Sequence, residues 1–376
     1  MPIAHRSRCM SRSLRTLAAC GLVLGAAHCG DANEVNDVVN PGDSIQAAVD
    51  RIPATADHWV IQVRPGVYKE SVDITRSGVE LRGVVEGEDR PILDGTMDGG
   101  MKRKDGMVVS GAYFTISGFL VRNYAGNGIT SQKTHDTTFR NVITDSAGKY
   151  GLYPVESERI LIENCVATNI ADAGIYVGQS KDAIVRGCVA HGNVAGIEIE
   201  NTVGALVENN EAYDNAGGIL VFLLPGGASK MASDCEVVNN NVHDNNHVNF
   251  GDPNTTVAKV PQGMGILVMA ADRTLVQGNR ITGNQSVGIT IASATAIAAN
   301  PGDQLDIEPN SDETNLVNNI YKNNGRAPSP QYFDLVKDYG ITKGGDLLFD
   351  GTGKKNCIEE LQEDELVTQG IPLPRC

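Results

Sequence analysis

The stretch that decides the fold is residues 173–200, AGIYVGQSKDAIVRGCVAHGNVAGIEIE. A glycine followed by isoleucine stands near each end of it. Similar pairs recur along the chain at a nearly constant interval, and one interval is about twice as long as the others. The pairs are Gly128-Ile129, Gly151-Leu152, Gly174-Ile175, Gly196-Ile197, Gly218-Ile219, Gly265-Ile266 and Gly288-Ile289. A repeat of roughly 20 to 50 residues is typical of solenoids, so this period determines the architecture.

A second apolar column has the same period and is out of phase with the first. Its members are Ile116, Phe139, Ile162, Val185, Val207, Val237, Val276 and Leu316. Short runs of β-forming residues alternate with Gly, Asn and Asp, whereas a helical repeat would need longer amphipathic segments. The sequence therefore predicts an all-β fold, a single-stranded right-handed parallel β-helix of about ten coils between residues 60 and 325.

Polar residues support the same architecture. Asn210, Asn240, Asn279 and Asn319 follow the second column at a constant offset, which predicts an internal or corner ladder of stacked amides. Ser44 precedes an amphipathic run that ends at Pro53, so residues 44–52 are expected to form a helix that caps the first coil. We therefore expect a β-helix with its cap at 44–330, after a linker at 29–43 and before a C-terminal tail at 331–376.

Residues 1–28 have the pattern of a secretory signal. Four arginines precede an apolar run at 17–27 that is too short to span a bilayer. Cys29 then follows as a site for lipid attachment, and the alternative is plain cleavage after one of residues 25–27. We expect an exported protein, in the periplasm or at the cell surface, that touches the membrane only through a lipid on Cys29.

Charge and cysteines restrict the partners and cofactors. Removal of residues 1–28 takes away four arginines and no acid, so the net charge falls from −15 to −19, which excludes nucleic acid as a partner. No spacing of His or Cys indicates a metal site and no cofactor is expected, although Ca²⁺ between coils stays open. Cys357 and Cys376 enclose the C-terminal tail and predict a disulfide. Cys165 and Cys188 are equivalent in adjacent coils, either bridged or as free thiols.

One outer face carries the candidate site. Side chains alternate along a strand, so Tyr176 points outward when Ile175 points inward. The same rule gives an outward column of Thr130, Tyr153, Tyr176, Glu198, Leu220, Leu267 and Thr290, and a second one of Val155, Glu200, Phe222 and Met269. Two coils are lengthened beside this face, at 223–234 and 246–263, as the walls of a binding groove are.

The face offers carboxyl groups for catalysis and rings for binding. Glu198, Glu200 and Tyr176 are the candidate catalytic residues, because a carboxyl group can act as acid or base. The candidate substrate-binding residues are Tyr153, Tyr176, Phe222, Lys149 and Asp172, since tyrosine rings match the faces of sugars. The alternative interpretation is a column that merely stacks on a solvated sheet, with Asp172 as a turn residue.

Four segments resemble exported bacterial parallel β-helix repeat proteins, often lipoproteins, whose function is unassigned. They are DAGIYVGQS at 172–180, AGIEIEN at 195–201, GGILVF at 217–222 and DGTGKKNC at 350–357. This resemblance implies an exported protein partner and no particular reaction. Residues 150–156, YGLYPVE, are more distantly similar to mannuronan epimerases, in which the stretch reads Tyr-Gly-x-Asp-Pro-His-Asp. Here Val155 stands where those enzymes have their catalytic histidine.

These features predict an exported cell-envelope protein that binds a polysaccharide or an exported protein partner on one face of the solenoid. The alternative is a polysaccharide-active enzyme, a lyase, epimerase or glycoside hydrolase, that uses the same face.

Overall fold

The computed structural model describes residues 34–297, 304–361 and 366–376. Val35–Cys376 form one compact unit. The signal predicted at 1–28 and the lipidation site predicted at Cys29 lie outside the described residues, and both stay predictions. No helix of the described part is long and apolar enough to cross a membrane.

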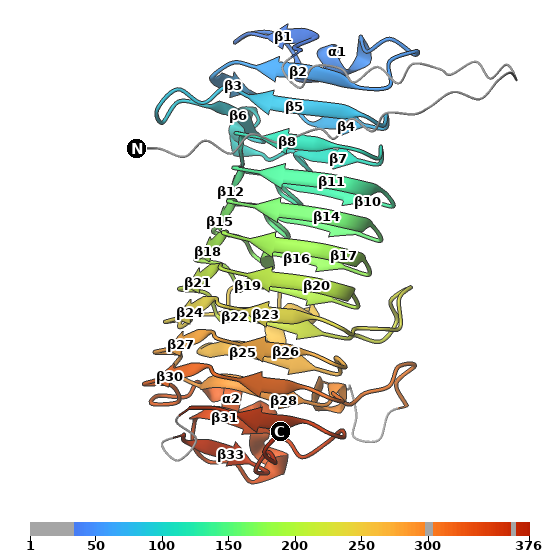
Figure 1. Ribbon diagram of the computed structural model, residues 1–376. Coiled ribbons are helices and arrows are strands. Elements are labelled where there is room, and N and C mark those ends of the chain that lie inside the picture. The colour runs from blue at the N-terminus through green and yellow to red at the C-terminus, as the bar shows by residue number, and fades with distance from the viewer. Residues whose placement is uncertain (1–33, 298–303, 362–365) are drawn as a thin grey trace, which may run out of the picture. The chain divides into compact units, whose positions relative to one another are not determined.

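Over the residues that the structure describes, three parallel sheets of 12, 11 and 10 strands run along this unit, and a complete coil adds one strand to each sheet (Figure 1). Sheet A consists of β1 (Asp37–Val39), β2 (Trp59–Val63), β5 (Val79–Gly83), β8 (Thr115–Ser117), β11 (His135–Arg140), β14 (Glu158–Glu163), β17 (Lys181–Arg186), β20 (Val203–Glu208), β23 (Glu236–Val238), β26 (Leu275–Gln277), β29 (Asn315–Val317) and β32 (Cys357–Glu359).

Sheet B consists of β3 (Gly66–Tyr68), β6 (Pro91–Asp94), β9 (Leu120–Arg122), β12 (Ile143–Asp145), β15 (Val166–Thr168), β18 (Val189–His191), β21 (Glu211–Tyr213), β24 (Asn241–His243), β27 (Arg280–Thr282) and β30 (Ile320–Lys322). Sheet C consists of β4 (Val72–Ile74), β7 (Met107–Val109), β10 (Ile129–Gln132), β13 (Leu152–Val155), β16 (Ala173–Gly178), β19 (Ala195–Glu200), β22 (Gly217–Phe222), β25 (Met264–Met269), β28 (Val287–Ala292), β31 (Gly345–Phe349) and β33 (Thr368–Gly370).

Both predicted apolar columns are confirmed. In sheet C the strands pair so that Ile129, Leu152, Ile175, Ile197, Ile219, Ile266 and Ile289 lie in one buried column. In sheet A the column from Ile116 to Leu316 is likewise in register and buried. Leu347 and Ile358 extend the two columns by one coil. Each coil therefore buries its apolar side chains against the next, which one coil alone could not do.

The corner between sheets A and B explains the glycines and asparagines that separate the strands. Its residues have positive φ, a conformation that glycine and asparagine adopt more readily than other residues. They are Asn164, Gly187, Asn209, Asn239, Gly278 and Asn318.

The predicted asparagine ladder is confirmed. The side-chain amide of Asn210 donates to the Oδ1 of Asn240 at 3.0 Å, Asn240 donates to Asn279 at 2.9 Å, and Asn279 to Asn319 at 2.9 Å. All four side chains are buried. The backbone N–H group of Cys188 donates to the side chain of Asn210. Cys188 therefore stands at the position equivalent to the ladder asparagines, one coil before Asn210. Cys165 and Cys188 are free, buried thiols.

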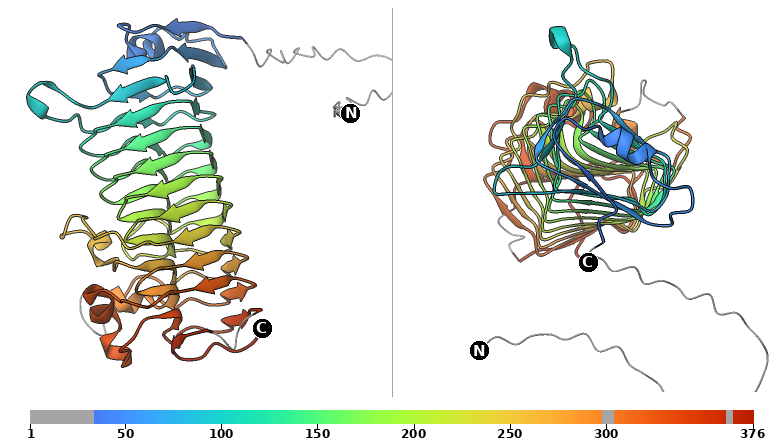
Figure 2. Two further views of the ribbon diagram at one scale, coloured as in Figure 1. Left: turned by 90° about the vertical axis from the view of Figure 1, so that its left-hand side faces the viewer. Right: turned by 90° about the horizontal axis from the view of Figure 1, so that it is seen from above.

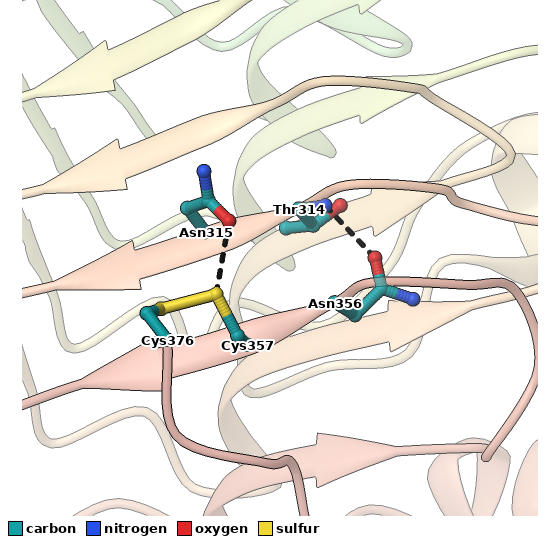
Figure 3. Close-up of a disulfide and its surroundings, with 5 residues drawn as sticks. All are labelled: Thr314, Asn315, Asn356, Cys357 and Cys376. Atoms are coloured by element: carbon teal, nitrogen blue, oxygen red, sulfur yellow. Dashed lines mark hydrogen bonds between the residues drawn. A yellow bond between two sulfur atoms is a disulfide. The ribbon is translucent and has the colours of Figure 1, made fainter.

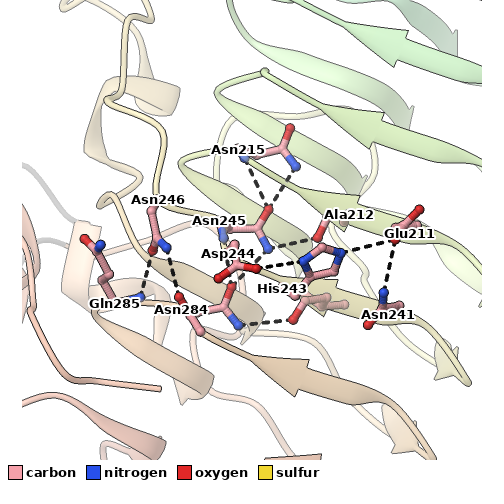
Figure 4. A network of polar contacts seen from close by, with 12 residues as sticks. Glu211, Ala212, Asn215, Asn241, His243, Asp244, Asn245, Asn246, Asn284 and Gln285 are labelled. Carbon is pink, nitrogen blue, oxygen red and sulfur yellow. Dashed lines mark hydrogen bonds and ion pairs between the residues drawn. The ribbon is translucent and has the colours of Figure 1, made fainter. Parts of the chain in front are cut away.

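A second ladder, which was not predicted from the sequence, runs beside the first. It consists of Asn193, Asn215, Asn245, Asn284 and Asn324, which donate from coil to coil at 2.9 to 3.1 Å. Figure 4 shows its members Asn215, Asn245 and Asn284. Four members lie five residues after members of the first ladder, so a signal was present in the sequence. The ladders end in carboxyl groups, at Glu360 for the first and at Asp346 for the second.

The N-terminal cap has the predicted form. Helix α1 (Ile45–Asp50) begins after Ser44, whose hydroxyl accepts the N–H of Ala47. The carboxylate of Glu70 accepts the N–H groups of Ile45 and Gln46, which satisfies two further donors of the first turn. Seen along the axis, the coils superpose and α1 lies over their first end (Figure 2). Strand β1, which pairs with β2, lies inside the segment expected to be a linker, so that part of the expectation is wrong.

The C-terminal residues also depart from expectation. The segment 331–376, predicted as a tail, contributes β31, β32 and β33, which extend sheets A and C. Helix α2 (Pro330–Val336) and the 3-10 helix η4 (Lys337–Tyr339) precede them. The predicted disulfide joins Cys357 on β32 to Cys376 (Figure 3). The β-helix therefore continues past residue 325, because Leu347 and Ile358 supply inward side chains for one more coil.

Candidate functional site

A pocket of about 610 Å³ lies against the outer face of sheet C, where the sequence analysis expects a groove. Outward side chains of β13, β19, β22, β25, β28 and β31 form its floor. Its walls come from the insertion 246–263, which contains the 3-10 helix η2 (Thr256–Lys259), and from the 3-10 helix η3 (Ala294–Ile297). Helix α2 and η4 complete the walls.

The floor follows the strand register. The pairing places two columns on the outer face: Thr130, Tyr153, Tyr176, Glu198, Leu220, Leu267 and Thr290 in the first, and Val155, Gly178, Glu200, Phe222 and Met269 in the second. Residues from successive coils are thereby neighbours at about the 4.8 Å spacing of paired strands.

Glu198 and Glu200 define the acidic end of the pocket. Both are on β19, where the alternation with buried Ile197 and Ile199 turns them outward. Neighbouring side chains and the pocket walls cover Glu198, which is 4% exposed. Asp172, on the turn before β16, lines the same end. Three carboxyl groups from two coils therefore meet at this end of the pocket.

Three tyrosine rings stack beside these carboxyl groups. The rings of Tyr150 and Tyr153 are parallel, with their centroids 4.4 Å apart. The ring of Tyr176 lies 4.7 Å from that of Tyr150 and 4.8 Å from that of Tyr153. Tyr150 and Tyr153 line the pocket. Tyr150 was missed by the sequence analysis, although it directly precedes one of the repeating glycines.

Tyr176 departs from its predicted role, because it is 2% exposed and does not line the pocket. Its ring lies over Gly178, where an added Cβ atom would come within 2.0 Å of the tyrosine hydroxyl oxygen. Gly178 therefore leaves the space that the ring occupies. The hydroxyl of Tyr176 donates to Glu200, so Tyr176 supports a carboxyl group and is not placed to contact a ligand.

Burial raises the pKa of all three carboxyl groups. The pKa of Asp172 rises to about 6, although a hydrogen bond from Tyr150 and the charge of Lys149 lower it in part. The pKa of Glu200 rises to about 7 through burial and the charge of Asp172, against a hydrogen bond from Tyr176. The pKa of Glu198 rises well above its usual value, because it is the most deeply buried and faces the other two. At neutral pH this end of the pocket therefore holds both protonated and ionised carboxyl groups.

Most residues of the predicted site come together. Glu198, Glu200, Tyr153, Phe222, Lys149 and Asp172 line the pocket, and Tyr176 lies beneath it. Lys149 also lines a smaller cleft of about 350 Å³, which contains Lys102 and Lys104.

The two insertions differ in their contribution. The insertion 246–263 forms a wall, whereas the insertion 223–234 provides Leu224 to the lining. Its remaining residues turn toward sheet A, where Ala228 donates to the side chain of Gln179 and the amide of Asn201 donates to the carbonyl group of Ser229. The expectation that this insertion overhangs the site therefore holds for its first residues alone.

The other end of the pocket is mostly apolar, with Thr290 and Asp350 as polar members. Its lining includes Leu220, Phe222, Leu224, Val257, Val260, Met264, Leu267, Met269, Ile297, Leu335, Val336 and Leu348. Among the described residues, no group of three or more His, Cys, Asp or Glu side chains is arranged to hold a metal ion. The expectations about cofactors, including Ca²⁺, therefore stay predictions.

Comparison with known proteins identifies the architecture. Residues 127–300 match the family model described as "Right handed beta helix region". No curated protein matches the sequence. Similar solved structures include two A-modules of mannuronan C-5 epimerases from Azotobacter vinelandii. AlgE4 has a TM-score of 0.58 and 17% identity over 84% of this chain and 83% of that one. AlgE6 has a TM-score of 0.59 and 16% identity over 88% and 92%.

A third similar structure is the DFA-IIIase from Arthrobacter chlorophenolicus A6 in complex with GF2, with a TM-score of 0.53 and 13% identity over 88% of this chain and 92% of that one. At these identities the likeness concerns the fold. The chain is a right-handed parallel β-helix, similar in fold to mannuronan C-5 epimerases and otherwise distant from them.

Proposed function

We propose that the protein is a glycoside hydrolase whose active site is the pocket on sheet C. The observation that carries the proposal is the cluster of Asp172, Glu198 and Glu200, three carboxyl groups of raised pKa beside the rings of Tyr150 and Tyr153. Carboxyl groups with strongly perturbed pKa values in a pocket are typical of catalytic acids and bases. The tyrosine rings provide flat apolar surfaces on which a sugar ring can lie.

The two glutamates suit the two tasks of hydrolysis. They stand at positions i and i+2 of one strand, so their Cα atoms are about 7 Å apart and their side chains leave the same face. Carboxyl groups held at roughly this spacing leave room for the attacking water of an inverting enzyme, whose carboxyl groups are about 6.5 to 9.5 Å apart. Glu198, whose pKa burial raises well above its usual value, donates a proton to the glycosidic oxygen. Glu200, with a pKa of about 7, accepts a proton from the water that attacks the anomeric carbon.

Lyase and epimerase chemistry fits the pocket less well. Val155 stands in place of the epimerase histidine, and no histidine lines the pocket in the part of the chain that the structure describes. The likeness in fold to a mannuronan C-5 epimerase and to a DFA-IIIase solved with GF2 supports a carbohydrate ligand without supporting either reaction.

The place of action is part of the proposal. Residues 1–28 read as a secretory signal and Cys29 as a lipidation site, so we propose that the enzyme acts on a carbohydrate of the cell envelope, in the periplasm or at the cell surface. Fractionation of cells that carry Cys29→Ala tests this, because loss of the lipid would release the protein from the membrane fraction. Equal membrane retention of both proteins would contradict it.

A second candidate function is carbohydrate or protein binding without turnover. Glu198 is only 4% exposed, so it could donate a proton only to a ligand that reaches far into the pocket. This deep burial favours binding without turnover. This candidate uses the same residues, so one experiment addresses both.

The experiment is a product scan on neutral and acidic oligosaccharides and on alkyl glycosides, with reducing ends, unsaturated sugars and epimer ratios all measured. We expect new reducing ends from the wild type and a loss of about 10²-fold or more in kcat for Glu198→Gln and for Glu200→Gln. Glu236→Gln is the matched control, because Glu236 is exposed on sheet A, away from the pocket. Binding without any product would leave the binding function, and an unsaturated product or a changed epimer ratio would replace hydrolysis by the lyase or epimerase reaction.

A further inference from the structure

The pocket changes its chemistry within one coil. Glu198 pairs with Leu220 of the next strand, and Glu200 pairs with Phe222. Leu267 and Met269 continue the two outward columns. The floor therefore passes from paired carboxyl groups to aliphatic side chains over about 4.8 Å, and it stays mostly apolar for the following coils.

The walls above this part of the floor carry both apolar and polar side chains. In the insertion 246–263, Val257 and Val260 line the pocket, and so do the exposed Asn254 and Thr255. In α2, Tyr332 and Val336 are buried and face the pocket at positions i and i+4. Both walls thus contribute apolar side chains above the apolar part of the floor.

These surfaces enclose space instead of closing on one another. Protein interiors are packed with few voids larger than a water molecule, so walls that served stability alone would fill the gap. The pocket of about 610 Å³ is within the range of ligand sites. Asp350, which lines the far end, already accepts the N–H groups of Ser293 and Thr352. A surface that is mostly apolar favours the apolar groups of a ligand.

We infer that the ligand is an amphiphile, a glycoside whose aliphatic aglycone occupies the apolar end of the pocket while its sugar lies on Tyr150 and Tyr153 beside the carboxyl groups. This inference rests on the proposed function for the sugar end and adds the class of substrate. A free oligosaccharide carries hydroxyl groups on every side, and Thr290 could pair with few of them, so most would lie without partners against the leucine, valine and methionine side chains. An alkyl chain has no hydrogen bonds to lose at this end of the pocket, and its binding removes apolar surface from water.

The test uses N-phenyl-1-naphthylamine, whose fluorescence reports an apolar site, displaced by methyl, hexyl and octyl glucosides and galactosides below their micellar concentrations. We expect the affinity to rise roughly three- to fourfold for each added methylene until the apolar end is full. Octanol is the control for the chain alone and should bind at least tenfold more weakly than the better octyl glycoside. Equal binding of octanol, or an affinity that does not depend on chain length, would overturn the inference.

Substitutions in the pocket test where the alkyl chain of the ligand binds. Ala292→Phe fills the apolar end, because Ala292 lines the pocket one coil after Met269. It should weaken octyl glycoside binding by tenfold or more and leave methyl glycoside binding unchanged. Leu267→Gln makes the same end polar without adding bulk and should act in the same direction. Thr282→Phe adds a ring to sheet B, away from the pocket, and is the matched control.

The outcomes separate this inference from the proposed reaction. If the affinity depends on the length of the alkyl chain but no glycoside is hydrolysed, the ligand is an amphiphile and the proposed hydrolase activity is wrong. If free oligosaccharides are hydrolysed and Ala292→Phe does not affect this activity, the hydrolase proposal holds and the inference of an amphiphilic substrate is wrong.

Discussion

Strand alternation turns Glu200 away from the core, and the pocket nevertheless leaves it only half-exposed. Its pKa of about 7 lies above the ordinary value of 4.5. The folded protein therefore binds this proton more tightly than the unfolded chain does. The resulting stabilisation is complete below about pH 4.5 and is lost as the pH rises through 7.

Glu200→Gln should remove this dependence. We expect the wild type to lose about 3 kcal/mol of unfolding free energy between pH 4.5 and pH 8 through this group, and the variant to lose correspondingly less. Urea titrations at several pH values measure the difference. Asp94, whose pKa is lowered to about 2, acts in a different window, because its contribution is lost below about pH 4. Parallel pH profiles of variant and wild type between pH 4.5 and 8 would contradict the assignment.

We expect two tyrosines of the stack to have different roles, one in ligand binding and the other in stability. Tyr153 lines the pocket, whereas Tyr176 lies buried beneath it. Tyr153→Ala should weaken sugar binding by about 1 kcal/mol with a small effect on folding, because it removes a stacking surface. Tyr176→Ala should cost about 3–5 kcal/mol of stability, because it opens a cavity. Calorimetric binding and thermal unfolding of both variants test the pair, and equal stability losses would refute the distinction.

Strand alternation predicts which residues face outward but not how deeply they lie. Ile197 and Ile199 establish the direction of Glu198 and Glu200 from the sequence alone. The burial of Glu198 depends on walls that come from other parts of the chain. The position of Tyr176 beneath the stack likewise depends on the small size of Gly178 in the neighbouring column. Such details arise from side-chain packing and have no local sequence signal.

At the scale of elements, the asparagine ladders hold the coils in register. Asn240 accepts from both the backbone and the side chain of Asn210, and it donates to Asn279 and to the carbonyl group of Val207. Asn240→Ala leaves several of these groups without partners and should cost about 2–4 kcal/mol.

Asn241→Ala is the adjacent control. Asn241 is half-buried and donates to Glu211 on the outside of sheet B, so we expect a loss below about 1 kcal/mol. Urea-induced unfolding of both variants measures the difference. Equal losses would show that the position inside the ladder is unimportant.

The repeat of about 23 residues predicts the elements that follow it and gives no information on those outside it. Strands β10 to β22 follow the repeat closely, and both apolar columns could be read there. The second ladder was not predicted, although its members from Asn215 onward follow those of the first ladder at a constant offset of five residues. Helix α2 is seven residues long and belongs to no repeat, so the part of the pocket that it walls could not be foreseen.

On the scale of the whole molecule, the disulfide closes the C-terminal end. Cys376→Ser removes a cross-link that spans 19 residues, a loop for which the chain-entropy account gives about 3 kcal/mol. Because each coil contacts only its neighbours, we expect the loss to stay local. Hydrogen exchange followed by mass spectrometry should show faster exchange in β31 and β32, with β16 and β19 unchanged. Uniform acceleration along the chain would contradict this view of the solenoid.

The length of the solenoid was underestimated for a related reason. Leu347 follows Ile289 in the inward column, but the segment between them is more than twice as long as one repeat. A pattern search loses the period over such a distance, although the strand pairing continues. The same long connection carries η3 and α2 to the pocket, so the missed coil and the missed walls have one cause.

The polarity of the two ladders gives the molecule an internal dipole. Each asparagine Nδ2 donates toward the next coil, so every amide presents its positive end to the C-terminal side. Aligned dipoles add, as peptide groups do along an α-helix. At the negative end, the first carbonyl oxygens accept the N–H groups of Cys188 and Ile170. At the positive end stand Glu360 and Asp346, so the carboxyl groups that finish the ladders oppose a field that the whole stack of coils creates.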